Sequence, residues 1–188
     1  SSPDIQSIVL VTHQGQKEAV MERFSYLKKL YSVVEGGKSR QQSVHAGVLA
    51  VPKETELFAI HDGARPLVPQ QVLEQTVEKA AQTGAAAPAV PVTDTIKRGE
   101  KGLTVETVDR SSLWAVQTPQ IFEAGLIRAA IEKAVEDQVE LTDDCAAVER
   151  LGMKVSLTQG SRENIKITTP FDLLVGEAIL DARGRGEL

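Results

Sequence analysis

The apolar positions of the chain form short continuous runs that are separated by segments of helical period. The first run, 8–11, is apolar at every position, which is typical of a strand that is buried on both faces. Similar strand-type runs follow at 31–34, 57–60, 85–92 and 155–157. Helical patterns lie between and after them, at 17–27, 40–49, 69–83, 123–136 and 142–151, with a last helix from Pro170 onward. Strands that alternate with helices in this way predict an α/β fold.

The predicted sheet is Rossmann-like and mostly parallel, with helices on both faces, because helical crossovers join strands that run in the same direction. Residues 1–188 then form a single domain, a size that can bury a substantial core. One segment breaks the pattern. Two strand-type stretches, 95–98 and 104–108, flank Gly99-Glu100-Lys101-Gly102, which is a hairpin signal. A hairpin here cannot bury both of its faces, so we expect residues 94–110 to project as an arm and to pack on a partner chain.

Composition and charge narrow the classes of function. The net charge is −5, which disfavours a general nucleic-acid binder and requires a local basic pocket for any phosphorylated substrate. Apolar runs stay far below the length that spans a membrane, so we expect no membrane segment. The single cysteine, Cys145, excludes an internal disulfide and a cysteine-rich zinc site, and it fits a reducing cytosol.

Two segments that follow strands carry candidate chemistry, since ligands of α/β proteins bind where strands end at their carboxyl side. In 36–43, paired glycines let the backbone approach a ligand, and Ser43 lies near the start of a helix. A plain strand-to-helix turn explains the same pattern. In 61–66, Asp62 can hold a metal ion or a sugar hydroxyl, and Arg65 offers forked donors for phosphate. The alternative is an Asp–Arg pair that braces its own turn.

Two later segments add polar groups. In 109–120, Arg110 and Thr118 could bind a phosphorylated substrate. In 164–170, which we expect to contain a short strand, alternation places Lys166 and Thr168 on one face, so both can point into a pocket. A lysine is more often a solvated surface charge. Thr169 is a candidate cap for the helix that starts at Pro170.

Six segments occur in a fixed order: Gly-Gly-Lys-Ser-Arg-Gln-Gln-Ser-Val, His-Asp-Gly-Ala-Arg-Pro, Val-Thr-Asp-Thr-Ile-Lys-Arg, Asp-Arg-Ser-Ser-Leu-Trp-Ala-Val-Gln-Thr-Pro-Gln, Leu-Thr-Asp-Asp and Asn-Ile-Lys-Ile-Thr-Thr-Pro-Phe-Asp-Leu. Together they resemble the 2-C-methyl-D-erythritol 4-phosphate cytidylyltransferases of the non-mevalonate isoprenoid pathway. Each segment alone is a weak signal, but six in register are specific. The resemblance covers nearly the whole chain, from about residue 9 to residue 178.

The resemblance implies a reaction in which a substrate phosphate oxygen attacks the α-phosphorus of CTP and displaces pyrophosphate, with Mg²⁺ on the triphosphate. It implies that Gly37 and Ser43 contact the cytosine. Asp62 and Gly63 would lie along the ribose and the triphosphate, with Asp62 as the metal ligand, and Lys166 would stabilise charge on the reacting phosphates. For the sugar-alcohol phosphate it implies Arg65, Thr95, Arg110, Thr118, Thr142, Lys166 and Thr168. Thr95 and Arg110 belong to the arm, which in this family reaches into the site of the partner subunit of a homodimer.

One departure from the family is large. The family opens with a strand and a loop of the form Ala-Ala-Gly-x-Gly-x-Arg-Met that wraps the triphosphate, and nothing in this chain matches it. We therefore expect unpaired strand edges beside the strands that end at Val11 and His61. A pentitol (ribitol) phosphate cytidylyltransferase and a non-catalytic nucleotide-binding module remain alternatives. The resemblance implies a cytoplasmic protein, or a plastid protein in a plant.

Overall fold

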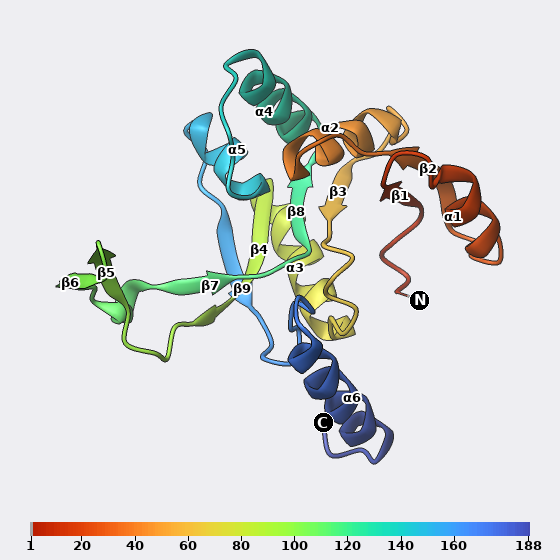
Figure 1. Cartoon of the computed structure of the whole chain (residues 1–188). Helices are drawn as coiled ribbons and strands as arrows, with labels where there is room; N and C mark the ends of the chain where they lie inside the picture. Colours follow the sequence, from red (N-terminus) through yellow and green to blue (C-terminus); the bar gives the residue numbers. More distant parts are fainter. Residues whose placement is uncertain (1) are drawn as a thin grey trace.

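The computed structural model describes residues 2–188 and shows an α/β fold with a projecting hairpin (Figure 1). The helices are α1 (Lys17–Arg23), α2 (Arg40–Ala50), α3 (Gln70–Thr83), α4 (Ala124–Glu136), α5 (Asp144–Arg150) and α6 (Pro170–Gly184). The strands are β1 (Ile8–Thr12), β2 (Leu30–Glu35), β3 (Leu57–Ile60), β4 (Ala85–Pro91), β5 (Lys97–Glu100), β6 (Leu103–Thr107), β7 (Trp114–Val116), β8 (Gln120–Glu123) and β9 (Ser156–Gln159). The α/β class predicted from the pattern is confirmed.

The main sheet corrects the predicted topology. Its strand order is β3-β8-β4-β7, and β9 pairs with β4. The strand β8 is antiparallel to β3 and β4, and β7 is antiparallel to β4, so this sheet is mainly antiparallel. Parallel pairing occurs between β4 and β9 and between β1 and β2. The prediction of a mostly parallel sheet was wrong because the pattern missed β7 and β8, whose short apolar runs lie inside a polar segment.

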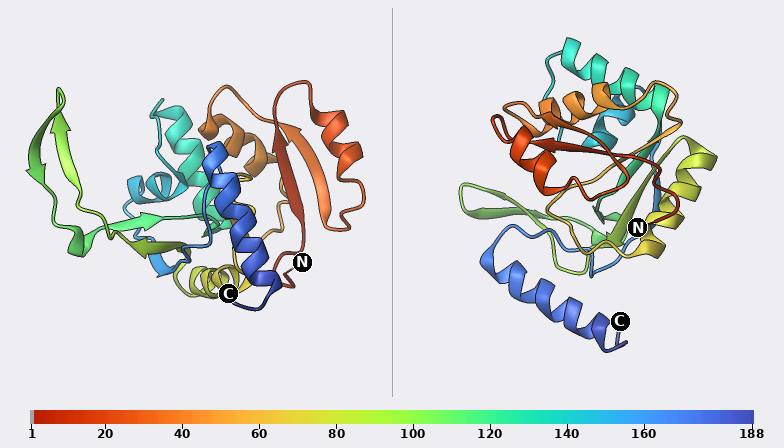
Figure 2. Two further views of the ribbon diagram at one scale, coloured as in Figure 1. Left: turned by 60° about the horizontal axis from the view of Figure 1, so that its bottom comes forward. Right: turned by 90° about the vertical axis from the view of Figure 1, so that its right-hand side faces the viewer.

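Core side chains pack on both faces of this sheet, because successive side chains of β8 point to opposite faces and are buried on each. Ile121 and Phe122 are adjacent and fully buried, and they point to opposite faces. Phe122 packs with Ile127 and Ile131 of α4 in the larger core cluster, which α5 also joins, and Ile121 packs with Ala80 of α3 in the smaller one. The prediction of helices on both faces is confirmed, and Figure 2 shows this layering from two further directions.

The strands β1 and β2 form a separate two-stranded sheet that α2 covers. Within residues 2–188, β1 pairs only with β2, and β3 pairs only with β8. The expected unpaired edges beside the strands that end at Val11 and His61 are therefore present. The loops that follow β1 and β2 line the hollow described below.

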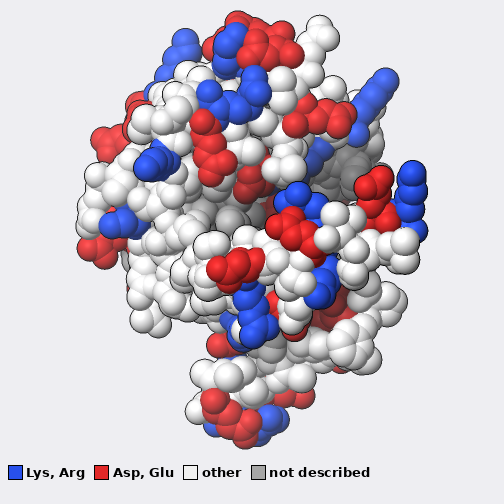
Figure 3. All heavy atoms as spheres, turned by 90° about the vertical axis from the view of Figure 1, so that its left-hand side faces the viewer, with Lys and Arg blue, Asp and Glu red and all other residues white. Residues whose placement is uncertain are grey.

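The hairpin β5–β6 stands away from the body of the molecule (Figures 1 and 2). Every residue of both strands is exposed, including Leu103 at 75% and Val105 at 61% of their surface. Figure 3 shows the face toward which this arm extends, where Lys and Arg side chains are interspersed with Asp and Glu. Among the described residues, the helices are all too short or too polar to cross a membrane.

The last helix, α6, begins with a capping box. Thr169 accepts a hydrogen bond from the backbone N–H of Asp172, and the Asp172 carboxylate accepts from the backbone N–H of Thr169. The prediction of Thr169 as the cap is confirmed. The strand expected in 164–170 does not form, since this segment makes no ladder, although its burial alternates. A backbone hydrogen bond from Ile167 N to Ala64 O, 2.8 Å long, joins it to the loop after β3.

Candidate active site

An ion pair between Asp62 and Lys166 lies at the end of β3. The Lys166 Nζ atom is 2.8 Å from Asp62 Oδ2, and the Asp62 side chain is 18% exposed. Arg65 draws the two segments together by donating from Nη1 to Asn164 O over 2.6 Å. The structure thus brings together Asp62, Arg65 and Lys166, which the sequence had predicted from segments about 100 residues apart.

Asp62 is charged in this environment. Burial favours its neutral form, but the hydrogen bond and charge of Lys166, with the charges of Arg40 and Arg65, hold the pKa of Asp62 below its usual value. A carboxylate that stays ionised beside a lysine amine fixes the position of that amine. The pair is therefore suited to present a positive charge to an anionic ligand.

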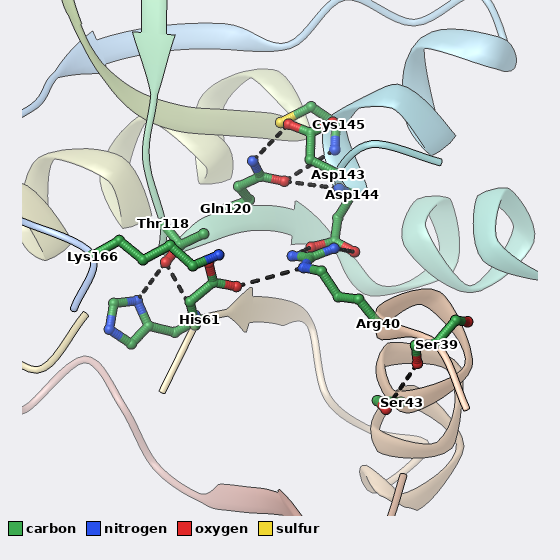
Figure 4. Close-up of polar contacts among 11 residues, drawn as sticks. Ser39, Arg40, Ser43, His61, Thr118, Gln120, Asp143, Asp144, Cys145 and Lys166 are labelled. Carbon is green, nitrogen blue, oxygen red and sulfur yellow. Dashed lines mark hydrogen bonds and ion pairs between the residues drawn. The ribbon is translucent and has the colours of Figure 1, made fainter. Parts of the chain in front are cut away.

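Thr118 and His61 support the backbone of Asp62. Thr118 Oγ1 accepts from Asp62 N over 3.1 Å and lies 3.0 Å from His61 Nδ1 (Figure 4). His61 Nε2 faces the Arg65 carbonyl at 2.9 Å, so Nε2 carries the proton of the neutral ring and Nδ1 accepts from Thr118. Burial lowers the pKa of His61, which favours this neutral ring. To donate to a substrate phosphate, Thr118 would have to release His61.

A hollow of about 480 Å³ opens beside the loop after β2. Gly37 and Ser43 line it together with Val11, Thr12, His13, Lys38, Ser39 and Arg40. Gly37 is required sterically, because a Cβ there would lie 2.3 Å from Gln42 Cβ. Ser39 caps α2 by accepting from Gln42 N, and Ser43 donates its hydroxyl to Ser39 O over 3.0 Å. The volume is within the range of small-molecule pockets.

The remaining predicted residues are spread over three parts of the chain. Gly63 is exposed, and a Cβ there would meet open space, so its backbone is accessible to a ligand. Thr142 is exposed just before α5. Thr168 is exposed next to Lys166 and donates its hydroxyl to Asp172 Oδ2. Their roles in binding stay predictions.

Thr95 and Arg110 are exposed at the base of the arm. Arg110 Nη1 donates to Thr93 O, so in this chain the guanidinium braces the start of the arm. Neither residue forms a hydrogen bond or ion pair with Asp62 or Lys166 within the described part of the chain. Their roles in binding stay predictions as well.

Sequence reasoning missed three residues that shape the site: Arg40, Gln120 and Asp144. Arg40 contacts both Asp62 and the buried Asp144, which lies 104 residues away in the chain. Burial raises the pKa of Asp144, and Arg40 opposes that rise. All three lie within the six segments that carry the resemblance, but none was given a role there, and an aspartate before a helix is read first as a cap.

The side chains of residues 2–188 include no group of three or more His, Cys, Asp or Glu residues placed to hold a metal ion. Asp62 is a single ionised carboxylate with one oxygen on Lys166. Magnesium commonly binds one or two protein carboxylates and completes its shell with phosphate oxygens and water. The donor set therefore fits Mg²⁺ that arrives with a nucleotide and does not fit a cage made by the protein alone.

Comparison with known proteins gives a consistent result over nearly the whole chain. The sequence profile of the family described as 2-C-methyl-D-erythritol 4-phosphate cytidylyltransferase matches residues 1–182. A protein of that name from Desulforamulus reducens is 48% identical over 185 residues, covering 96% of this chain and 79% of that protein. Another, from Bacillus licheniformis, is 46% identical over 183 residues and covers 96% of this chain and 78% of its own length.

Solved structures agree with these sequences. The 4-diphosphocytidyl-2C-methyl-D-erythritol synthase of Anaerococcus prevotii superimposes with a TM-score of 0.85 at 28% identity, covering 94% of this chain and 79% of that one. The 2-C-methyl-D-erythritol 4-phosphate cytidylyltransferase of Thermus thermophilus gives a TM-score of 0.78 at 31% identity, covering 94% of this chain and 99% of that one. The resemblance found in the six sequence segments is thereby confirmed.

Proposed function

The chain belongs to the 2-C-methyl-D-erythritol 4-phosphate cytidylyltransferase family, and we propose that the Asp62–Lys166 pair beside the Gly37 hollow is the site of its reaction. The reaction transfers CMP from CTP to 2-C-methyl-D-erythritol 4-phosphate and releases pyrophosphate, in the non-mevalonate route to isoprenoids. An oxygen of the substrate phosphate forms the new bond to the α-phosphorus as the bond to pyrophosphate breaks. Such a transfer depends on positioning and on neutralisation of charge.

The observation that carries this proposal is the 2.8 Å contact between Lys166 Nζ and Asp62 Oδ2. The pair holds a positive amine in place before any ligand binds, and a preorganised charge stabilises a transition state without reorganisation during the reaction. Arg40 lines the hollow beside Gly37 and also contacts Asp62. A nucleotide base in the hollow would therefore place its phosphates toward Lys166.

Ser43 gives a physical reason for selecting cytosine. Its hydroxyl hydrogen is donated to Ser39 O, so only its lone pairs remain for a ligand. The exocyclic amine of cytosine can donate to such an acceptor, whereas the corresponding carbonyl oxygen of uracil cannot. With uracil bound, the Ser43 oxygen would be left without a hydrogen-bond donor, and the loss of such a bond discriminates strongly between two ligands.

Magnesium would be held by Asp62 together with oxygens of the triphosphate, and it would supply further positive charge against the phosphates. Lys166 would offset the charge that develops around the α-phosphorus. Arg65, Thr118, Thr142 and Thr168 would bind the methylerythritol phosphate. Thr118 takes this role only by turning its hydroxyl away from His61.

We place Thr95 and Arg110 in the site of a partner subunit of a homodimer. The support is the exposed arm, since Leu103 and Val105 present apolar surface far from the body of their own chain. Exposed apolar surface of this kind marks a contact with another chain.

Release of pyrophosphate from purified protein tests the function. With CTP, Mg²⁺ and 2-C-methyl-D-erythritol 4-phosphate we expect steady release of pyrophosphate. Release should be much slower when ribitol phosphate replaces the methylerythritol phosphate, or when UTP replaces CTP. A Ser43→Ala variant should bring the rates with CTP and UTP closer together. Equal rates with both sugar phosphates, or release with ribitol phosphate alone, would contradict the assigned substrate.

A further inference from the structure

Arg40 lies between two carboxylates and joins them. Its Nη1 and Nη2 atoms donate to the two oxygens of Asp144 over 3.1 and 2.6 Å. Its Nε atom is 3.5 Å from Asp62 Oδ1, and Asp62 Oδ2 is held by Lys166. The charged groups therefore form the row Asp144, Arg40, Asp62, Lys166, and Figure 4 shows Arg40 reaching from α2 toward Asp144.

Asp144 is the fixed end of this row. It is 2% exposed, and its backbone N–H donates to Gln120 Oε1 over 3.0 Å, as does that of Cys145. Gln120, at the start of β8, is itself 2% exposed and also donates to Asp143, the cap of α5. One buried amide of the main sheet thus sets the position of the first turn of α5, and with it the Asp144 carboxylate.

The two contacts of Arg40 are unequal. The bidentate contact with Asp144 fixes both the position and the plane of the guanidinium, because the fork of arginine matches a carboxylate. The contact with Asp62 is longer and uses a single nitrogen. Arg40 can therefore orient Asp62 while leaving its other oxygen to Lys166. Without Asp144, the guanidinium would be free to close on Asp62 and to compete with Lys166.

We propose that Asp144 and Arg40 are positioning residues for Asp62: Asp144 holds the guanidinium of Arg40, and Arg40 sets the orientation of the Asp62 carboxylate toward Lys166. This inference rests on the proposed function of the Asp62–Lys166 pair. A buried ion pair is weak support for stability, since apolar residues of the same volume commonly stabilise as well. Because Arg40 also contacts Asp62, the Arg40–Asp144 pair has a role besides stability, which is to orient the Asp62 carboxylate.

A purely structural clamp between α2 and α5 is the competing explanation, and a paired substitution separates the two. Arg40→Gln alone leaves Asp144 buried without a cation and should lower stability. The double variant R40Q/D144N replaces the ion pair by two neutral groups that can still hydrogen-bond, so thermal stability should recover toward that of the unchanged protein. Orientation of Asp62 is lost in both variants.

We expect kcat of R40Q/D144N to fall roughly 10- to 100-fold at a temperature where it is fully folded, with KM for the sugar phosphate nearly unchanged, since partners behind a ligating group typically have this effect. Arg128→Gln is the matched control. Arg128 is a half-buried arginine that donates to Val48 O, Val51 O and Pro52 O. Its substitution should lower stability and leave kcat unchanged in the folded protein. A double variant whose kcat returns with its stability would overturn the proposal.

A crystal structure of R40Q/D144N provides a readout that does not depend on turnover. The Asp62 carboxylate should be turned from its position in the unchanged protein, with altered contact to Lys166. An unchanged carboxylate would overturn the inference even if the protein is an active cytidylyltransferase. If the unchanged protein transfers no CMP, the proposed function fails, and the carboxylate position still decides whether Arg40 orients Asp62.

Discussion

The charged side chains of the site are identifiable from sequence only where they stand in short local patterns. Asp62 follows an apolar strand and Lys166 lies in an alternating segment, and the structure brings the two into an ion pair. Arg40 and Asp144 gave no such signal, because their pairing depends on where the fold places the starts of α2 and α5. A long-range ion pair cannot be read from spacing along the chain.

Lys166 carries a prediction at this scale. Substitution by alanine should lower turnover with CTP by at least roughly 100-fold while the fold survives, since loss of one preorganised charge-stabilising group typically has this effect. Steady-state kinetics on folded protein measures it.

Lys133 offers a matched control, because its Nζ is 2.6 Å from Asp137 Oδ1 in an exposed ion pair on α4. Lys133→Ala should leave turnover unchanged. Near-normal turnover of a folded Lys166→Ala variant would remove Lys166 from the mechanism.

His61 predicts a dependence of stability on pH. Burial lowers the pKa of His61 from 6.5, so the unfolded chain binds the proton at a higher pH than the folded chain does. Stability should therefore fall as the pH drops from above 6.5 toward the lower folded value. His61→Asn should reduce this fall.

Urea unfolding at several pH values measures the effect, with the exposed His13→Asn as the control that keeps it. The expectation is contradicted if His61→Asn and the unchanged protein lose stability equally as the pH drops.

At the scale of elements, long periodic segments were predictable and short strands between polar residues were not. The helices and the apolar strands β1 to β4 appear where the pattern placed them, with shifted ends. The strand β8 was missed because buried Gln120 and exposed Glu123 enclose only Ile121 and Phe122. Its antiparallel insertion between β3 and β4 is what changed the topology of the sheet.

The arm predicts how the chain assembles. Aspartate at both Leu103 and Val105 should dissociate a homodimer that forms through β5 and β6, because charge would then be buried in an apolar contact. Sedimentation should show a dimer for the unchanged protein and a monomer for L103D/V105D.

The exposed Val135 and Leu151 provide a control on another surface. V135D/L151D should remain dimeric. A monomeric unchanged protein, or a dimer that survives L103D/V105D, would contradict assembly through the arm.

At the scale of the whole molecule, the structure brings Asp62 and Lys166 into contact, whereas Thr95 and Arg110 lie on the arm. If Arg110 serves a neighbouring site, an Arg110→Ala chain mixed with an Asp62→Ala chain should regain part of the activity that each lacks alone. One site of the mixed dimer then keeps both groups. Confirmed heterodimers that stay inactive would show that Arg110 acts within its own subunit.

The most direct test of the proposed site is a crystal structure of the protein with CTP and Mg²⁺. We predict cytosine in the hollow beside Gly37 and Ser43, with the triphosphate at the Lys166 amine and its magnesium ion on Asp62. A second hollow of about 330 Å³, lined by Gln75, Glu78, Lys79, Gln82, Thr158 and Gln159, lies at α3 and β9. Nucleotide bound there, or anywhere that leaves Lys166 away from its phosphates, would contradict this assignment.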